Sequence, residues 1–343
     1  MLAHLMENPR FEDYLAIMET MKALMHMKYG STEMLSVESL AAPQVGDDEV
    51  LVKVAAVSIN PYDWHMMRGL PYLLRLQSGL FKPKNYGIGS DFAGTIVAVG
   101  KNVSTFVPGD EVFGGGKGTL ADFTCVSPNK IVLKPTTLTL EESASISMAG
   151  ETALQAVRDK GQVSAEQNVL IDGASGGVGT FAVQIAKSLG AKVTGVCSSR
   201  NVEMVRSIGA DHVIDYTRED FTKSGLLYDV IIDAAGNHTL SEYQRALEPK
   251  GILVLVGGGD GGRFGFGVIL GLLKLLVLSQ IASQKMIQML TRPNRQDLLV
   301  LKEMIEQGKI KPIIEKVYPF SAAIEAIQYV GSGHAKAKIV ITL

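Results

Sequence analysis

The sequence predicts an α/β protein that combines a small β-barrel with a doubly wound parallel sheet. Residues 21–134 contain short apolar segments separated by turn residues, which is typical of a barrel-like domain. Residues 168–290 instead alternate strand-like and helix-like segments, the pattern of a parallel sheet with helices on both faces. A chain of 343 residues is long enough for two such domains.

The composition excludes several classes of protein. Hydrophobic residues make up 46% of the chain and charged residues 20%, as in ordinary globular proteins, and the net charge of -2 gives no basis for nucleic-acid binding. The two cysteines, Cys125 and Cys197, exclude a disulfide framework and a four-cysteine zinc lobe. The N-terminus lacks the pattern of a secretion signal, so we expect a reducing, cytoplasmic compartment.

Residues 1–20 differ from the rest of the chain, and we treat them as an N-terminal extension without an assigned function. They could form one amphipathic helix, or they could reflect an upstream start codon, because Met21 begins like a first strand. In the barrel region, strands are predicted at 49–59 and 94–100, and residues 108–110 form a turn.

The segment 60–69, between those two strands, is polar and aromatic, and we predict a loop there. More chemistry gathers in it than a connection requires, and functional residues are common on loops that a rigid scaffold positions. The alternative is a connector packed under a domain interface. The predicted catalytic residues are Asn60, Tyr62, Asp63 and His65.

Residues 140–160 are predicted to be mostly helical, with Thr139 as the capping residue and two acidic residues in the first turn. They lead towards residues 168–180, which carry the motif around which the chain is organised. A strand is predicted at 168–172, a glycine-rich loop comes next, and residues 180–189 have helical spacing.

This strand, loop and helix form the geometry that places a pyrophosphate on a helix N-terminus. Glycines permit the tight turn and close backbone approach, and the amide dipoles meet the negative charge. A second strand at 192–196 supplies the expected context, whereas the alternative is a glycine-rich surface turn. The predicted cofactor-binding residues here are Gly173, Ser175, Gly176, Gly177, Val178 and Gly179.

The tip of the second strand predicts which dinucleotide binds. An acidic residue at that tip would hold the ribose diol of NAD and repel a 2′-phosphate, but the first acid is Glu203 on the following helix. Hydroxyls and a guanidinium suit a phosphate, so we predict NADPH over NADH; a merely solvated arginine is the alternative. The predicted contacts at the strand tips are Ser198, Ser199, Arg200, Tyr216, Ala235 and Gly257.

Residues 264–282 are apolar nearly all round, and their length and composition alone would suggest a membrane span. They fall between strands predicted at 252–256 and 286–290, however, and a span there would split the sheet. We expect a buried helix that lines an apolar pocket or a subunit contact, with peripheral membrane attachment as the alternative. After a helix at 296–307, strands at 313–317 and 337–341 are expected to return to the first domain.

Three motifs together resemble the medium-chain dehydrogenase/reductase superfamily, and most of all its zinc-independent quinone oxidoreductase branch, also called zeta-crystallin-like. They are Gly-Ala-Ser-Gly-Gly-Val-Gly at 173–179, Ser-Ile-Asn-Pro-Tyr-Asp at 58–63 and Gly-Ser-Asp-Phe-Ala-Gly at 89–94. The resemblance covers residues 21–343. It implies a GroES-like catalytic domain (21–147, completed by 291–343), a Rossmann NADP-binding domain (148–290) and a homodimer.

The departures from the zinc enzymes of this superfamily are informative. Those enzymes hold catalytic zinc with a cysteine where this chain has Asn60 and with a histidine where it has Ser90. We therefore predict no metal site. An irregular alternative would combine Asp63, His65, Asp91 and Glu151.

The resemblance implies hydride transfer from NADPH to a quinone or to the β-carbon of an α,β-unsaturated carbonyl. Without a metal to stabilise an alkoxide, reduction of an acceptor that is already electrophilic is the easier reaction. We expect the Asn60 amide and the Tyr62 hydroxyl to bind the carbonyl oxygen, with Tyr62 or solvent as proton donor. Asp63 would brace the loop, and His65 would donate a proton or face solvent.

Three alternatives stay open. The first is an enoyl-thioester or alkenal reductase with the same fold and cofactor. The second is a non-catalytic NADPH-binding sensor or scaffold that binds partners through residues 264–282. The third is a zinc alcohol dehydrogenase with unusual ligands.

Overall fold

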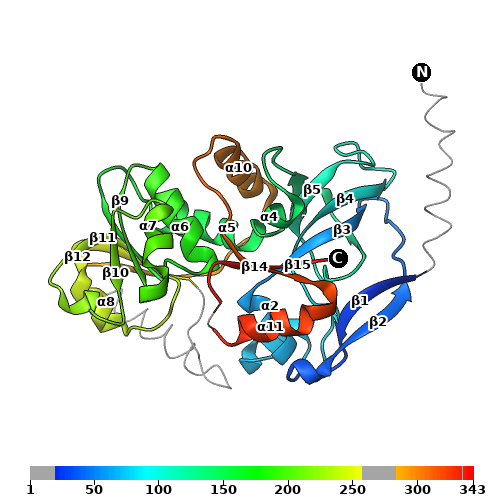
Figure 1. The fold of residues 1–343 in the computed structure, drawn as a ribbon, viewed down its shortest axis with the longest axis horizontal. Helices are drawn as coiled ribbons and strands as arrows, with labels where there is room; N and C mark the ends of the chain where they lie inside the picture. Colours follow the sequence, from blue (N-terminus) through cyan, green and yellow to red (C-terminus); the bar gives the residue numbers. More distant parts are fainter. Residues whose placement is uncertain (1–19, 257–282, 334) are drawn as a thin grey trace.

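The computed structural model describes residues 20–256, 283–333 and 335–343 (Figure 1). Within these residues the chain forms two large sheets side by side, each with its own helices. The expectations for residues 1–19 and 264–282 lie outside the described residues.

The first sheet contains strands from both ends of the chain, in the order β14-β15-β3-β4-β5-β7, and β6 also pairs with β3. Figure 1 shows the red C-terminal strands lying against blue and cyan ones. Strand β15 runs antiparallel to β3 and pairs Ile339 with Ile59. The strands are β3 (Val50–Ile59), β4 (Asp91–Val99), β5 (Glu111–Gly115), β6 (Phe123–Val126), β7 (Ile131–Leu133), β14 (Ile314–Pro319) and β15 (Lys338–Thr342).

A separate antiparallel hairpin precedes this sheet. It pairs β1 (Thr20–His26), which the sequence predicts from Met21 onward, with β2 (Leu35–Ala41), which it does not. The sheet itself is stabilised by large apolar side chains that are fully buried, such as Phe92, Ile96 and Leu120.

The second sheet is entirely parallel and has the order β10-β9-β8-β11-β12-β13. The strand order reverses between β8 and β11, and in doubly wound sheets ligands bind at the carboxyl ends of the strands beside such a reversal. The strands are β8 (Asn168–Asp172), β9 (Lys192–Cys197), β10 (His212–Asp215), β11 (Tyr228–Asp233), β12 (Leu247–Val256) and β13 (Lys285–Met289).

The helices follow the predicted alternation closely. Thr139 caps the helix that starts at Leu140 with a capping box. Its hydroxyl accepts from the Glu142 backbone amide, and the Glu142 carboxylate accepts from the Thr139 backbone amide. The α-helices beyond it are α4 (Leu140–Ala144), α5 (Ser147–Leu154), α6 (Gly177–Ser188), α7 (Val202–Ser207), α8 (Leu240–Ala246), α10 (Arg295–Glu306) and α11 (Ala323–Gly331). A π-helical turn (Gln155–Lys160) extends α5, and 3₁₀ turns lie at Thr32–Met34, Tyr72–Leu74, Pro128–Lys130, Ser199–Asn201, Phe221–Lys223 and Phe320–Ala322.

The predicted loop at 60–69 is wrong, because these residues form helix α2 (Pro61–Arg68). The Asp63 carboxylate accepts a hydrogen bond of 2.8 Å from the backbone amide of Asn60. This bond caps the start of the helix. Proline is favoured in the first helical turn, where its missing N–H costs nothing. Gly69 ends the helix with φ of 58°, a left-handed conformation that suits glycine. A short helix α3 (Arg75–Ser78) comes next.

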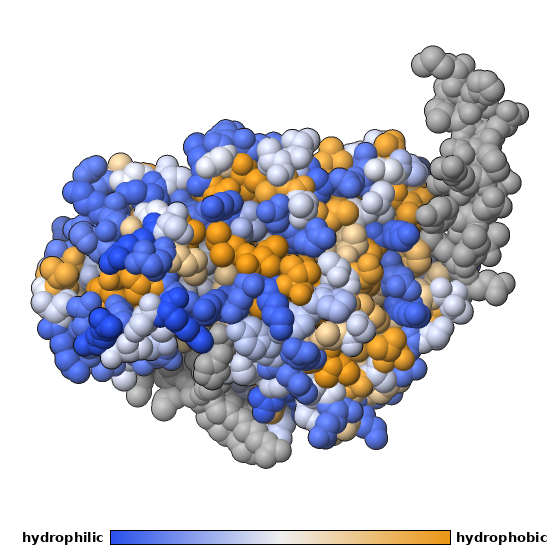
Figure 2. Space-filling view, in the orientation of Figure 1, coloured by the Kyte–Doolittle hydropathy of each residue, from blue (hydrophilic) through white to orange (hydrophobic). Residues whose placement is uncertain are grey.

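The surface of the described residues is mixed. On the face drawn in Figure 2, apolar patches are separated by hydrophilic side chains. Over the described part of the chain, every helix is too short or too polar to cross a membrane.

Candidate functional site

The glycine-rich loop between β8 and α6 is built for close approach. Gly173 has φ of 78°, and a Cβ on Gly179 would lie 2.1 Å from the Gly173 carbonyl oxygen. A Cβ on Gly176 would meet only that same oxygen, at 3.4 Å, so one side of the loop is open. Helix α6 begins at Gly177 and directs its free amides towards this opening. The loop thus has the backbone and the helix end that a pyrophosphate requires.

Ser175 and Ser198, predicted from separate motifs, are brought together by Asn201, which was not predicted from the sequence. The Asn201 amide nitrogen donates to Ser175 Oγ at 3.1 Å and to Ser198 Oγ at 3.2 Å. Asn201 is buried and joins the glycine loop to the tip of β9. A side-chain amide nitrogen can donate two hydrogen bonds. The asparagine just beyond the end of β9 was therefore the hint that the loop and the strand end are linked.

An acidic side chain approaches this tip from the neighbouring strand. Asp215, the last residue of β10, accepts a hydrogen bond of 2.5 Å from Ser199 Oγ. It also accepts from the Thr217 amide and hydroxyl and lies 3.4 Å from Arg218, and these donors lower the pKa of Asp215, the Ser199 hydrogen bond most of all. Tyr216 was predicted from the sequence and Asp215 was overlooked, although both follow from the rule that strand ends meet at one edge of a sheet.

The remaining strand-tip predictions differ in position. Arg200 and Tyr216 are exposed near the β9 and β10 ends, and Tyr216 is 60% exposed. Ala235 lies beside the glycine loop, since a Cβ on Gly173 would come within 3.3 Å of the Ala235 methyl. Gly257 lies outside the described residues.

The predicted catalytic residues occupy the start of α2, but they are not equally accessible. Asn60 is only 4% exposed, and its amide is bonded within the protein: Oδ1 accepts from Lys338 Nζ at 2.6 Å, and Nδ2 donates to Asp91 Oδ2 at 3.0 Å. Asp63 is buried, whereas Tyr62 is 46% exposed. His65 is half-buried, with Nδ1 3.2 Å from the Leu70 carbonyl oxygen.

Lys338 and Asp91 form the centre of this polar cluster. Asp91 Oδ2 also accepts from Ser58 Oγ at 3.0 Å, and Asp91 Oδ1 accepts from the Met148 amide at 3.0 Å. Lys338 Nζ lies 3.4 Å from Asp91 Oδ2, and both side chains are almost wholly buried. Lys338 was not predicted from the sequence. The available hint in the sequence was that this lysine directly precedes the apolar residues 339–341, which are expected to be buried.

Burial changes the protonation of these groups. Burial raises the pKa of Asp63 to about 7. The hydrogen bond from the backbone amide of Asn60 opposes this rise, and the charge of Asp91 adds to it. Burial lowers the pKa of Lys338, against the pull of Asp91 and Asp63. The pKa of Tyr62 is raised by burial and by the charge of Asp63. Burial thus disfavours the charged forms of both Asp63 and Lys338.

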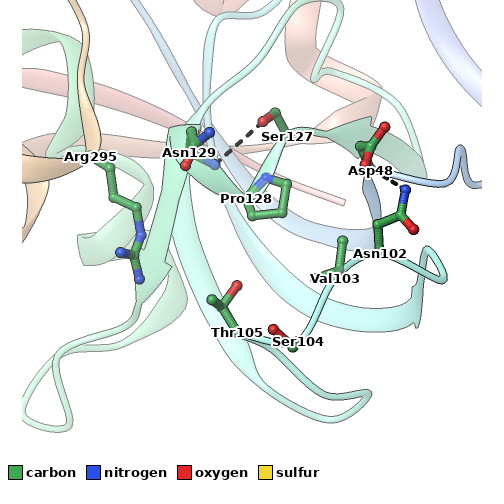
Figure 3. Close-up of a pocket in the computed structure, with 9 residues that line it drawn as sticks. All are labelled: Asp48, Asn102, Val103, Ser104, Thr105, Ser127, Pro128, Asn129 and Arg295. Carbon is green, nitrogen blue, oxygen red and sulfur yellow. Dashed lines mark hydrogen bonds between the residues drawn. The ribbon is translucent and has the colours of Figure 1, made fainter.

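A polar pocket of about 270 Å³ lies on another part of the barrel sheet (Figure 3). It is distinct from the predicted site, since none of its residues was predicted to bind cofactor or substrate. Its lining residues are Asp48, Asn102, Val103, Ser104, Thr105, Ser127, Pro128, Asn129 and Arg295.

Comparison with known proteins agrees with this geometry. A family model described as "Alcohol dehydrogenase GroES-like domain" matches residues 46–136, and one described as "Zinc-binding dehydrogenase" matches residues 208–341. The mouse mitochondrial NAD(P)H oxidoreductase RTN4IP1 is 34% identical over 348 residues, covering 92% of this chain and 87% of the relative. The chain belongs to the medium-chain dehydrogenase/reductase superfamily, in its quinone oxidoreductase-like branch.

Two further relatives support the same assignment. The chloroplastic NADPH-dependent alkenal/one oxidoreductase of Arabidopsis thaliana is 31% identical, covering 95% of this chain and 80% of the relative. The quinone oxidoreductase structure from Coxiella burnetii superposes with a TM-score of 0.81 at 27% identity, covering 94% of this chain and 99% of that one. The predicted fold, a GroES-like domain with a Rossmann-like parallel sheet, is confirmed. The protein is a quinone oxidoreductase-like enzyme with a nicotinamide cofactor and a small-molecule substrate.

The name of one family model raises the question of zinc, and the residues present do not fit it. Where the zinc enzymes have two ligands, this chain has Asn60 and Ser90, and the Lys338 ammonium lies against the Asn60 oxygen. A divalent cation there would face a buried positive charge. In the described part of the chain, no three His, Cys, Asp or Glu side chains come close enough to hold a metal ion. The irregular set of Asp63, His65, Asp91 and Glu151 is therefore not assembled.

Proposed function

We propose that this enzyme is an NADPH-dependent reductase that delivers hydride to a quinone or to the β-carbon of an enone without zinc. The observation that carries the proposal is the position of Lys338. Next to a glycine loop of the dinucleotide type, its ammonium group contacts Asn60, where the zinc enzymes of the superfamily have a metal ligand. A site of this kind favours acceptors that need no Lewis acid.

The proposed division of labour follows from accessibility. Bound NADPH would supply the hydride. Tyr62, half-exposed at the start of α2, donates a hydrogen bond to the acceptor's carbonyl oxygen as negative charge builds there. Asn60, whose amide is bonded to Lys338 and Asp91, fixes the helix start instead of touching the acceptor. His65 is the second candidate proton donor, and Asp63 caps the helix.

The preference for NADPH rests on the tip of β9. Ser198 and Arg200 present a hydroxyl and a guanidinium there, which suit a 2′-phosphate, whereas the Ser199 hydroxyl already donates to Asp215. Asp215 would repel that phosphate, but its oxygens are occupied by Ser199, Thr217 and Arg218. We infer that this local pairing reduces the repulsion enough for NADPH to be preferred.

The cofactor preference is tested with Arg200→Ala. Removing the guanidinium should raise the Kd for NADPH about tenfold, roughly the effect of one charge-assisted contact, and leave the Kd for NADH nearly unchanged. Arg206→Ala is the matched control, because Arg206 is exposed on α7 and pairs with Glu203. Titration by cofactor fluorescence measures both constants. Equal weakening of NADPH and NADH by Arg200→Ala would contradict the preference.

The reaction is tested by following NADPH oxidation with a small quinone, an enone and an enoyl thioester, using metal-stripped protein. Turnover that resists chelators and favours the quinone or the enone is the expected result. Faster turnover of the enoyl thioester would favour the second candidate, an enoyl-thioester reductase. Tight NADPH binding without turnover of any acceptor would point to a sensor or scaffold.

We further propose the domain division at 21–147 with 291–343 and at 148–290, because each range contributes one of the two large sheets. A homodimer and a cytoplasmic location stay predictions. Two relatives are named as mitochondrial and chloroplastic proteins.

A further inference from the structure

The residue before β15 is bonded to the backbone of the glycine-rich loop. The Ala337 amide donates to the Ser175 carbonyl oxygen at 2.7 Å, and Gly176 and Ala337 form a parallel bridge. Ala337 has φ of 48°, a left-handed conformation that a residue with a Cβ rarely adopts. This segment is therefore fixed by the same backbone that would receive the pyrophosphate.

From there the Lys338 side chain runs past α6 to the start of α2. A Cβ on Gly177 would lie 3.1 Å from Lys338 Cδ, so the aliphatic stem passes directly over the first residue of α6. The ammonium group at its end lies 2.6 Å from Asn60 Oδ1. One side chain thus spans the distance between the glycine-rich loop and Asn60 at the start of α2.

The ammonium group also determines how Asn60 is oriented. A lysine only donates hydrogen bonds, so Asn60 must turn its oxygen towards Lys338 and its NH₂ group towards Asp91. The charged groups facing Lys338 are Asp91 and Asp63, and the side chain is 2% exposed. Losing a partner would leave a buried charge uncompensated, so we expect the ammonium group to stay with Asn60 and Asp91 when the backbone of β15 moves.

We propose that Lys338 is a positioning residue that couples the glycine loop to the first turn of α2, so that seating the cofactor sets the position of Asn60 and Tyr62. The coupling rests on the proposed function in one respect, that the glycine loop binds NADPH. Lys338 touches neither substrate nor cofactor in this role. It acts through Asn60.

Hydrogen exchange with and without NADPH tests the coupling. In the wild type, NADPH should slow exchange both at 173–180 and at 60–68. In Lys338→Met, which keeps the stem and removes the charge, the slowing at 173–180 should persist, whereas that at 60–68 is lost and free-state exchange there rises about fivefold or more. Lys338→Arg should restore part of the effect. Lys316→Met, on neighbouring β14, is the matched control and should resemble the wild type.

Steady-state kinetics give a second readout. Lys338→Met should lower kcat about tenfold or more while the KM for NADPH stays within about threefold, because coupling and not cofactor binding is lost. The proposal would be overturned if residues 60–68 of Lys338→Met exchanged at the wild-type rates both with and without NADPH. So would a fall in kcat that is matched by an equal rise in the KM for NADPH.

Gly177→Ala keeps the proposal testable if Lys338→Met does not fold. The added methyl would press on the lysine stem at 3.1 Å while the buried charge is retained. Exchange at 60–68 should rise in this variant, and unchanged exchange there overturns the coupling. This comparison needs no nucleotide. If NADPH protects nothing in the wild type, the proposed function fails, and the coupling is still decided by the free-state exchange of Gly177→Ala.

Discussion

Tyr62 differs from its neighbours in accessibility. Its ring is 46% exposed, while Asn60 and Asp63 beside it are buried and bonded within the protein. Of these three side chains, Tyr62 alone is open to solvent, and the proposed acceptor would therefore meet it first. A tyrosine hydroxyl is protonated at neutral pH, and the raised pKa of Tyr62 keeps it so to higher pH, so that it can donate a hydrogen bond.

Tyr62→Phe should lower kcat with an enone by about tenfold to a hundredfold, since one hydrogen bond to the developing oxyanion is lost. The KM for NADPH should stay the same. Tyr216→Phe is the control, because Tyr216 is exposed in the proposed cofactor site and the loss of its hydroxyl should affect the KM for NADPH and not kcat. Wild-type kcat in Tyr62→Phe would mean that the acceptor needs positioning only.

At the scale of elements, the stability of α2 depends on the glycine that ends it. Gly69 has φ of 58°, and a Cβ there would lie 2.6 Å from Tyr29 Cδ1 and 2.7 Å from Arg75 Nε. Gly308, just beyond α10, has φ of 68°, but a Cβ there would have nothing within 4 Å. The two glycines share a backbone conformation and differ in their surroundings.

Gly308→Ala should lower the free energy of unfolding by about 1 kcal/mol, the strain of a left-handed alanine. Gly69→Ala should cost about 2 to 4 kcal/mol, because a clash with Tyr29 and Arg75 is added to that strain. Urea unfolding at neutral pH measures both. Equal losses in the two variants would show that Tyr29 and Arg75 move aside freely.

The elements predicted well from the sequence are those with local signals. The β8 strand, the glycine loop and α6 are contiguous, and their pattern fixes them without reference to the rest of the chain. Helix α2 is not predicted, because Asn60 and Asp63 suggest an acceptor-binding group and a loop brace, whereas in the structure they form the start of a helix. Lys338 could not be placed, because its partner Asn60 is 278 residues away in sequence. Hydrophobic periodicity says nothing about which buried polar groups meet across such a distance.

For the whole molecule, buried carboxyl groups contribute to how stability depends on pH, and three of them have strongly raised pKa values. Burial raises the pKa of Asp63 and of Glu151 to about 7, and that of Asp172 to about 6. Below the pKa of an unfolded carboxyl group, each is protonated in both states. As pH rises, the unfolded chain releases these protons freely, while the folded protein must keep them or bury a charge. The stability that they contribute is therefore lost as pH rises through about 7.

Glu151→Gln isolates one of these groups, because glutamine can still accept from the Asn294 amide, which lies 2.7 Å from Glu151 Oε1. The variant should be close to wild type in stability at pH 5 and more stable at pH 8, by about 3 kcal/mol at most. Urea unfolding at both pH values gives the difference. Glu203→Gln is the control, since Glu203 is exposed on α7. A difference that shrinks between pH 5 and pH 8 would reverse the assigned sign.

The pairing of β15 with β3 has a consequence for biosynthesis. During translation, the strands of the parallel sheet leave the ribosome together with the helices that cover them, so that sheet can form while synthesis continues. Strand β3 emerges much earlier, yet its neighbour β15 comes from the last residues of the sequence. Until then, residues 56–59 at the end of β3 lack a partner on one side, because β6 pairs only with residues 50–53, and they are open to pairing with other chains. We therefore expect this end of β3 to be a place where the nascent chain can pair wrongly before β15 is made.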